Sequence, residues 1–243
     1  MNFFLLLLLS LLINTVFQIP KALAFRFTPM VAEVSPQGEG TSQVFVVENN
    51  SKEKVALQFK ATTRSYEVDG KETRSITTDF VIYPEQIALE PNDKRNVRVT
   101  YVGAPNIQIE KPYRLIATQL PVEFKKSQKI SKLNFLLEYV AALYVNPTNT
   151  SPQIKVLSTK TSGDHTVLLE VENQGTQHQL LTDAKLSLIL KTQTLDLNKK
   201  SFEEFRNENL LPKEKRILKV ETTQALQAGQ EIISQLTFPD PRE

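Results

Sequence analysis

The sequence predicts an all-β protein built from two tandem immunoglobulin-like β-sandwich domains. Apolar and polar residues alternate in short segments along most of the chain, and turn residues separate these segments. The first half holds about seven such segments in roughly 120 residues, the spacing typical of an immunoglobulin-like sandwich. A polar segment with two prolines at 146–152 then divides the chain, and the alternating segments resume after it.

The composition is that of a globular protein, and it excludes several kinds of chemistry. Of the 243 residues, 40% are hydrophobic and 23% are charged, and the formal net charge is +2. Such a small net charge gives no reason to expect nucleic acid as a partner. The chain has no cysteine, so disulfide bonds and thiolate chemistry are excluded.

Residues 1–24 are predicted to be a signal peptide. The apolar run FFLLLLLSLLINTVF is followed by Ala22 and Ala24, which fit the small-x-small pattern of a cleavage site and leave Phe25 as the mature N-terminus. The run is shorter than the ~20 residues that span a bilayer, which favours cleavage over an uncleaved membrane anchor. In both cases the remainder of the chain is exported.

Residues 25–147 are expected to form the N-terminal domain. Asp69-Gly70 is the strongest short hairpin signal in this half. After the opening segment, the strand-like stretches lie at 42–50, 54–68, 80–84, 86–103, 111–124 and 132–147, and the stretch at 86–103 holds two strand-like pieces around the turn EPND.

Residues 148–243 are expected to form a second, smaller β-sandwich. Turn residues separate its segments, for example at Ser162-Gly163-Asp164. Its strand-like stretches lie at 153–159, 165–173, 184–192, 216–223 and 231–238.

The stretch KLNFLLEYVAALYVNP at 132–147 fits two periodicities, those of an amphipathic helix and of a long strand. Leu, Glu and Ala favour a helix. However, every neighbouring segment is a strand, and Asn146-Pro147 ends the stretch without a helix C-cap. We therefore predict a strand of about thirteen residues, longer than the ~5–6 of a typical strand.

Such a long strand leaves part of its apolar face beyond a sandwich of ordinary height. In its first half, Leu133, Phe135 and Leu137 share one face, and polar residues occupy the other. This apolar row is expected to protrude and bind an external partner. The alternative is a taller core, or a loop of the same chain that covers the row.

At this point the sequence resembles the periplasmic chaperones of pilus (fimbrial) assembly by the chaperone–usher route. The motifs FRFTPMVAEVSPQGEGTSQVFVVENNS and FVIYPEQIALEPNDKRNVRVTYVG match the opening strands and the P…L.P…..VR signature of that family. EKPYRLIATQLP, from Glu110 to Pro121, matches the spacing of its E…YR……LP segment. The stretch at 132–147 aligns with its long donor strand. The resemblance covers most of residues 25–147.

The resemblance implies a chaperone that lends a strand to pilus subunits lacking their C-terminal strand, a form of β-augmentation. The donor side chains would be Leu133, Phe135 and Leu137, with Tyr139 extending the row. The further implied partner is an outer-membrane usher, and the implied location is the periplasm. No cofactor or metal is implied, because burial supplies the energy. Self-association of the empty chaperone stays open.

One expected feature of the family is missing. Its members hold the subunit's C-terminal carboxylate with an Arg on the first strand and a Lys on the donor strand, but the Lys position here falls on Ala142. The segment 31–34 contains no basic residue. A buried carboxylate needs a cation or several N–H donors. The candidate substitutes are Arg114, Arg26 and Arg64.

The resemblance also implies a buried ion network between the domains. Glu110 matches one member of that network, whereas the expected Arg falls on Ala88.

Catalysis is not expected. His165 and His178 are the only histidines, and their spacing assembles neither a triad nor a metal site. The alternative function is an exported immunoglobulin-like structural or adhesion module, which would have no reason to keep a protruding apolar row.

Overall fold

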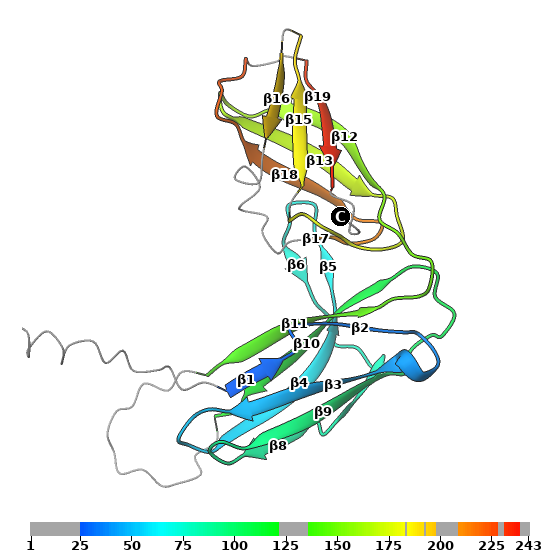
Figure 1. Cartoon of the computed structure of the whole chain (residues 1–243), viewed down its shortest axis with the longest axis vertical. Helices are drawn as coiled ribbons and strands as arrows, with labels where there is room; N and C mark the ends of the chain where they lie inside the picture. The colour runs from blue at the N-terminus through cyan, green and yellow to red at the C-terminus, as the bar shows by residue number, and fades with distance from the viewer. Residues whose placement is uncertain are drawn as a thin grey trace, which may run out of the picture.

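The computed structural model describes residues 25–121, 136–182, 184–191, 193–197, 209–227 and 231–238 (Figure 1). In these ranges every regular element is a β-strand except one short 3₁₀ turn, η1 (Glu39–Thr41). The same ranges contain no helix long and apolar enough to cross a membrane. Two separate hydrophobic cores are present, so the prediction of an all-β fold with two sandwich domains is confirmed.

The first sandwich consists of two sheets. In spatial order, the first sheet contains β1 (Phe25–Thr28), β3 (Ser42–Asn49), β9 (Lys94–Tyr101) and β7 (Phe80–Tyr83). The second sheet contains β2 (Val31–Val34), β11 (Glu138–Val145), β10 (Lys111–Gln119), β4 (Val55–Thr63) and β8 (Gln86–Leu89). A ribbon of β5 (Ser65–Tyr66) and β6 (Glu72–Thr73) projects from this sandwich toward the second domain (Figure 1).

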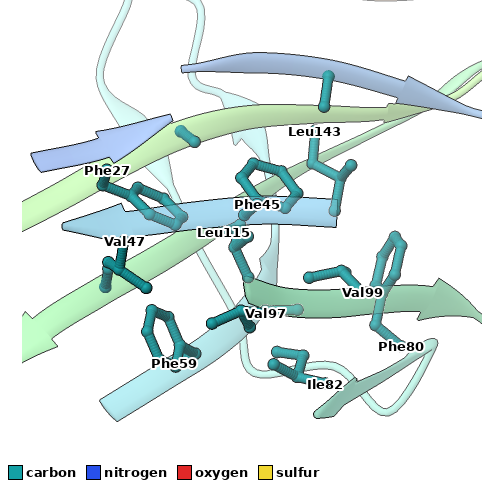
Figure 2. Close-up of a cluster of buried hydrophobic side chains, with 14 of the residues drawn as sticks. Phe27, Phe45, Val47, Phe59, Phe80, Ile82, Val97, Val99, Leu115 and Leu143 are labelled. Carbon is teal, nitrogen blue, oxygen red and sulfur yellow. The ribbon is translucent and has the colours of Figure 1, made fainter. Parts of the chain in front are cut away.

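The core of the first domain lies between these two sheets, as Figure 2 shows. Alternate side chains of each strand point inward, which is the burial pattern that the sequence alternation predicts. Phe27 from β1 stacks on Phe45 from β3, with ring centroids 5.2 Å apart. Each such ring, once fully buried, stabilises the fold by about 1.5–3 kcal/mol.

The second sandwich is built from shorter strands. One sheet contains β12 (Ile154–Thr161), β13 (Thr166–Asn173) and β18 (Lys215–Glu221). The other contains β16 (Thr194–Leu197), β15 (Lys185–Ile189) and β19 (Ile233–Thr237), and a pair is formed by β14 (Gln179–Leu180) and β17 (Asn209–Leu210). Leucines and valines fill the core between them.

A buried asparagine closes the same corner in both domains. The amide nitrogen of Asn49, at the end of β3, donates to the carbonyl oxygen of Leu89 at 3.2 Å. The amide nitrogen of Asn173, at the end of β13, donates to the carbonyl oxygen of Leu210 at 3.1 Å. These leucines begin the related segments LEPNDKR and LLPKEKR. The two domains therefore repeat one corner motif, in which an amide side chain satisfies main-chain groups that a loop leaves unpaired.

Two segments differ from their predicted extent. The segment expected as one strand at 54–68 is broken at Arg64, where β4 ends and the ribbon of β5 and β6 begins. The stretch at 132–147 forms a strand, as predicted, over Glu138–Val145. Residues 132–135 lie outside the described residues, so the predicted length of about thirteen residues remains a prediction.

The second half of β11 is apolar on both faces because each face meets a different neighbour. Ala141, Leu143 and Val145 point into the core of the first sandwich. Ala142 and Tyr144 point the other way and pack against Leu211 of the second domain and Tyr66 of the ribbon. The outer face of β11 is therefore part of the contact between the domains.

Candidate functional site

One edge of β11 is only partly covered. Strand β10 pairs with β11 along its whole length on one side. On the other side β2 pairs with it, in parallel, only over Ala142–Val145. Within the described part of the chain, Glu138–Ala141 therefore form a strand edge without a partner.

The main-chain groups along this open edge are directed outward. The peptide N–H of Ala142 donates to the carbonyl oxygen of Met30, beside β2, at 2.9 Å, whereas the carbonyl of Leu137 accepts a bond from the β10 side. Successive residues of a strand direct their main-chain groups to opposite sides. By this alternation Glu138 and Val140 direct their N–H and C=O groups to the open edge.

The predicted donor side chains fall partly inside the described residues. Leu137 and Tyr139 both pack against the core of the first sandwich. The Tyr139 hydroxyl also donates to the carbonyl oxygen of Phe25 at 2.8 Å, and the two rings meet edge to face. Tyr139 thus belongs to the chain's own core. Leu133 and Phe135 lie outside the described residues.

An arginine cluster lies on the outer face of the same sheet. Glu72 on β6 accepts hydrogen bonds from the Arg64 Nε at 3.1 Å, from the Arg114 Nε at 3.1 and 3.2 Å, and from the Arg114 Nη2. Arg74 also pairs with the Glu72 carboxylate. One carboxylate therefore serves three guanidinium groups and leaves an excess of positive charge.

The cluster keeps Glu72 ionised. Burial on its own opposes ionisation, but the bonds and charges of Arg114, Arg74 and Arg64 outweigh it and lower the pKa of Glu72 from 4.5 to about 2. The Glu72 side chain is only 14% exposed. The carboxylate is therefore a fixed negative charge at any pH near neutrality.

Two of the three candidate anchor arginines lie in the cluster at Glu72, and the third lies on the other sheet. Arg114 stands directly opposite Ala142 in the β10–β11 ladder, so their side chains share one face of the sheet. Arg64 is buried and meets Arg114 at Glu72. Arg26 lies on β1 in the other sheet, with an exposed side chain. The structure thus brings two of the three arginines together.

Tyr144 connects the cluster to the second domain. Its hydroxyl accepts a hydrogen bond from the Arg64 Nη1 at 2.9 Å and another from the Asn209 amide at 2.6 Å. Its ring stacks on the imidazole of His178, with centroids 4.1 Å apart and the planes 9° from parallel. Burial raises the pKa of the Tyr144 phenol, so it stays neutral.

Glu110 pairs with His178 across the domain boundary. The Glu110 side chain is fully buried, and both carboxylate oxygens lie 2.9 Å from the His178 Nδ1. The peptide N–H of His178 also donates to this carboxylate. Ala88, where the resemblance places an arginine, lies exposed on the edge strand β8. Within the described residues, a histidine from the second domain thus pairs with Glu110.

The ribbon of β5 and β6 clamps the second domain. The carbonyl of Val68 accepts a main-chain bond from Ile217 at 2.9 Å, and the N–H of Tyr66 donates to the Glu214 carboxylate at 2.9 Å. The Arg216 guanidinium lies over the Tyr66 ring, 4.5 Å from its centroid. The hairpin signal at 69–70 predicts this turn, but no local signal indicates that it reaches another domain.

Sequence reasoning missed Glu72, Tyr144 and His178 as members of this site. Tyr144 and His178 have partners more than 60 positions away, and Glu72 meets Arg114 across 42 positions, so no short motif links these pairs. Across the described ranges, no group of three or more His, Cys, Asp or Glu residues is placed to hold a metal ion.

Comparisons with known proteins agree with this geometry. Residues 28–151 match the family model of the pili and flagellar-assembly chaperone, PapD N-terminal domain. No curated protein sequence matches the chain.

Solved structures extend the likeness to both domains. A chain of the CsuC–CsuE chaperone–tip adhesion subunit pre-assembly complex from the archaic Csu pili of Acinetobacter baumannii aligns with a TM-score of 0.57 at 17% identity, covering 87% of this chain and 97% of that chain. The class 5 fimbriae chaperone CfaA aligns with a TM-score of 0.57 at 13% identity, covering 89% and 100%. The Salmonella enterica complex of SafA pilin with the SafB chaperone gives 0.53 at 14%, covering 83% and 85%.

The identities to these structures are low, so these matches establish the fold. The family model spans about half of the sequence, including β11 and the arginines of the cluster. The chain therefore belongs to the pili and flagellar-assembly chaperone family.

Proposed function

We propose that this protein is a periplasmic chaperone that binds pilus subunits by donor-strand complementation and hands them to an outer-membrane usher. Subunits are the proposed clients because the CsuC–CsuE and SafA–SafB structures are complexes of a chaperone with a subunit. The proposal includes removal of residues 1–24 on export and a division into domains at 25–147 and 148–243.

The open edge of β11 is the single observation that carries this proposal. A client strand that adds to Glu138–Ala141 meets outward main-chain groups and forms the ladder of a β-augmented sheet. Strand β2 occupies the same edge from Ala142 onward, so the added strand must end there. The first residue of β2, Val31, thus marks the point beyond which a client strand cannot pair with β11.

The charge at this point selects the direction of the client strand. A strand that runs parallel to β11 reaches Ala142 with its C-terminal carboxylate, whereas an antiparallel strand brings an ammonium group. Arg114 shares the face of Ala142, and the guanidinium cluster around Glu72 carries excess positive charge. A carboxylate is favoured there. Arg114 is therefore the proposed carboxylate anchor, in place of a lysine at 142.

The apolar row ahead of this edge supplies the specificity. In the proposal, Leu133, Phe135 and the part of Leu137 that the chain's own core leaves uncovered enter the open core of the subunit. Full burial of Leu133 or Phe135 stabilises the complex by about 1.5–3 kcal/mol. Tyr139 is left out, because its hydroxyl and ring are engaged with Phe25 of the chain's own core.

Co-expression with a strand-deficient pilus subunit tests the function. The Phe135→Asp variant should stay folded but lose the co-purified subunit, because a charge in the subunit core is costly. Leu136→Asp is the matched control, since Leu136 is 52% exposed on the other face and should retain the subunit. Retention of the subunit by both variants would contradict donor-strand binding and favour a structural module.

A further inference from the structure

The guanidinium of Arg114 is used on one edge only. Glu72 accepts bonds from its Nε and Nη2 atoms, which form the side-on edge of the planar group. The Nη1 atom has no hydrogen-bond partner within the described residues, and it is not among the atoms buried without one. A guanidinium presents five N–H donors in a rigid fork and can bind a second carboxylate on its other edge.

We infer that Glu72 is a positioning residue, which holds Arg114 so that its free edge receives the C-terminal carboxylate of the client strand. This inference rests on the proposed function, and it adds the residue that orients the proposed carboxylate anchor. Glu72 does not touch the client. It fixes the plane of the guanidinium through its own two oxygens.

The neighbouring arginines explain why Glu72 can hold Arg114 without neutralising the site. Glu72 carries one negative charge, and Arg64, Arg74 and Arg114 carry three positive ones. A second carboxylate can therefore enter while the cluster stays cationic. Arg64 cannot take the role of Arg114, because it already donates to four groups, namely Glu72, Tyr144, Tyr66 and Asn209.

The position of Glu72 on the ribbon also links the orientation of Arg114 to the second domain. The ribbon also contacts the second domain through Tyr66 and Val68. The orientation of Arg114 therefore depends on a segment that both domains hold in place. Client recognition on the first domain is in this way tied to correct docking of the second.

A pair of synthetic peptides tests the inference. Both are twelve-residue strands of alternating Val and Thr, one with a free C-terminal carboxylate and one with a carboxamide. Binding to the full exported chain is measured by titration calorimetry at low salt. The wild-type protein should bind the carboxylate peptide about tenfold more tightly, as expected for hydrogen bonds to a charged group.

The Glu72→Gln variant should reduce this ratio to near one and leave the affinity for the carboxamide peptide unchanged. Arg114→Ala should do the same, and adding Glu72→Gln to Arg114→Ala should change nothing further. Glu67→Gln is the matched control, because Glu67 is an exposed carboxylate on the same ribbon. Thermal unfolding checks that each variant is folded, and Glu72→Asp replaces Glu72→Gln if the latter does not fold.

The outcomes separate this inference from the proposed function. A ratio that stays near tenfold in Glu72→Gln, or rises above it, overturns the role of Glu72 while strand addition stands. A wild-type protein that binds both peptides equally overturns the carboxylate anchor at Arg114. A wild-type protein that binds neither peptide overturns the open-edge function and the inference with it.

Discussion

Arg114 and Ala142 stand directly opposite each other on β10 and β11, with their side chains on one face of the sheet. The family resemblance implies a lysine on the donor strand at position 142. In this chain a cation is present one strand away, and a glutamate on a neighbouring ribbon fixes its orientation. The alanine is thus compatible with a positively charged site.

The ribbon that carries Glu72 should be sensitive to a methyl group at its tip. Gly70 has φ +94°, and a Cβ there would lie 2.8 Å from the Nη2 of the buried Arg216. Gly163 has φ +83° with no atom within 4 Å. Gly163→Ala should therefore cost about 1 kcal/mol for its backbone alone. Gly70→Ala should cost at least about 1 kcal/mol more, because Arg216 must move.

Urea unfolding of the two variants measures this difference. Equal losses of stability in Gly70→Ala and Gly163→Ala would show that the Arg216 side chain moves at little cost. They would also show that contacts with the second domain do not hold the ribbon in place.

The pairing of Glu110 with His178 should stabilise the contact between the domains. His178→Ala removes the imidazole and leaves the fully buried Glu110 carboxylate with the peptide N–H of residue 178, so it should cost about 3 kcal/mol in the free energy of unfolding. His165→Ala removes one contact to a carbonyl oxygen in a turn and should cost less than about 1 kcal/mol. Chemical denaturation compares the two variants. Adding Glu110→Gln to His178→Ala should restore part of the loss, and a double variant no more stable than the single one would contradict the pairing.

The arginine cluster should make the stability depend on pH in acid solution. The folded-state pKa of Glu72 lies at about 2, below its ordinary value of 4.5. The unfolded chain therefore takes up the proton first as the pH falls. The stabilisation is complete above pH 4.5 and is lost as the pH approaches 2, by up to about 3 kcal/mol.

Unfolding followed from pH 6 to pH 2 checks this dependence. Glu72→Gln should be less stable than the wild type at pH 6 and should lose less stability on acidification. Parallel curves for the two proteins would show that Glu72 is not held as an ion by the arginines. Glu214 acts in the opposite sense, because burial raises its pKa and its contribution weakens as the pH rises.

Much of the fold follows from local patterns, whereas most of the candidate site does not. Alternation predicts the strands that fill both cores, and the context of 132–147 predicts a strand where residue propensity favours a helix. The strand β16 was not predicted, although Leu195 and Leu197 alternate with exposed residues, because four residues are too few to stand out from a loop. The alternating pattern also continues past Arg64, so it does not reveal that β4 ends at Thr63. The residues around the break are polar, and they give no signal for it.

The residues of the site are joined by contacts between distant parts of the chain. Arg64 and Asn209 are 145 positions apart, and Glu110 and His178 are 68 apart. Each is an ordinary polar residue in its own segment. Only the packing of two domains and a ribbon places them together, so a single sequence contains no local signal for the cluster.

The open edge of β11 can be tested through one main-chain hydrogen bond. The N–H of Val140 points to the side that β2 leaves uncovered, so Val140→Pro removes a donor that the chain's own sheet does not use. Proline is tolerated at such edge positions, and the variant should fold with a loss of about 1 kcal/mol or less. Ala141→Pro is the matched control, because the N–H of Ala141 points toward β10, and loss of this ladder hydrogen bond should destabilise the domain more than Val140→Pro does. In co-expression, Val140→Pro should lose the strand-deficient subunit while remaining folded. A folded Val140→Pro protein that still co-purifies with the subunit would exclude strand addition at this edge.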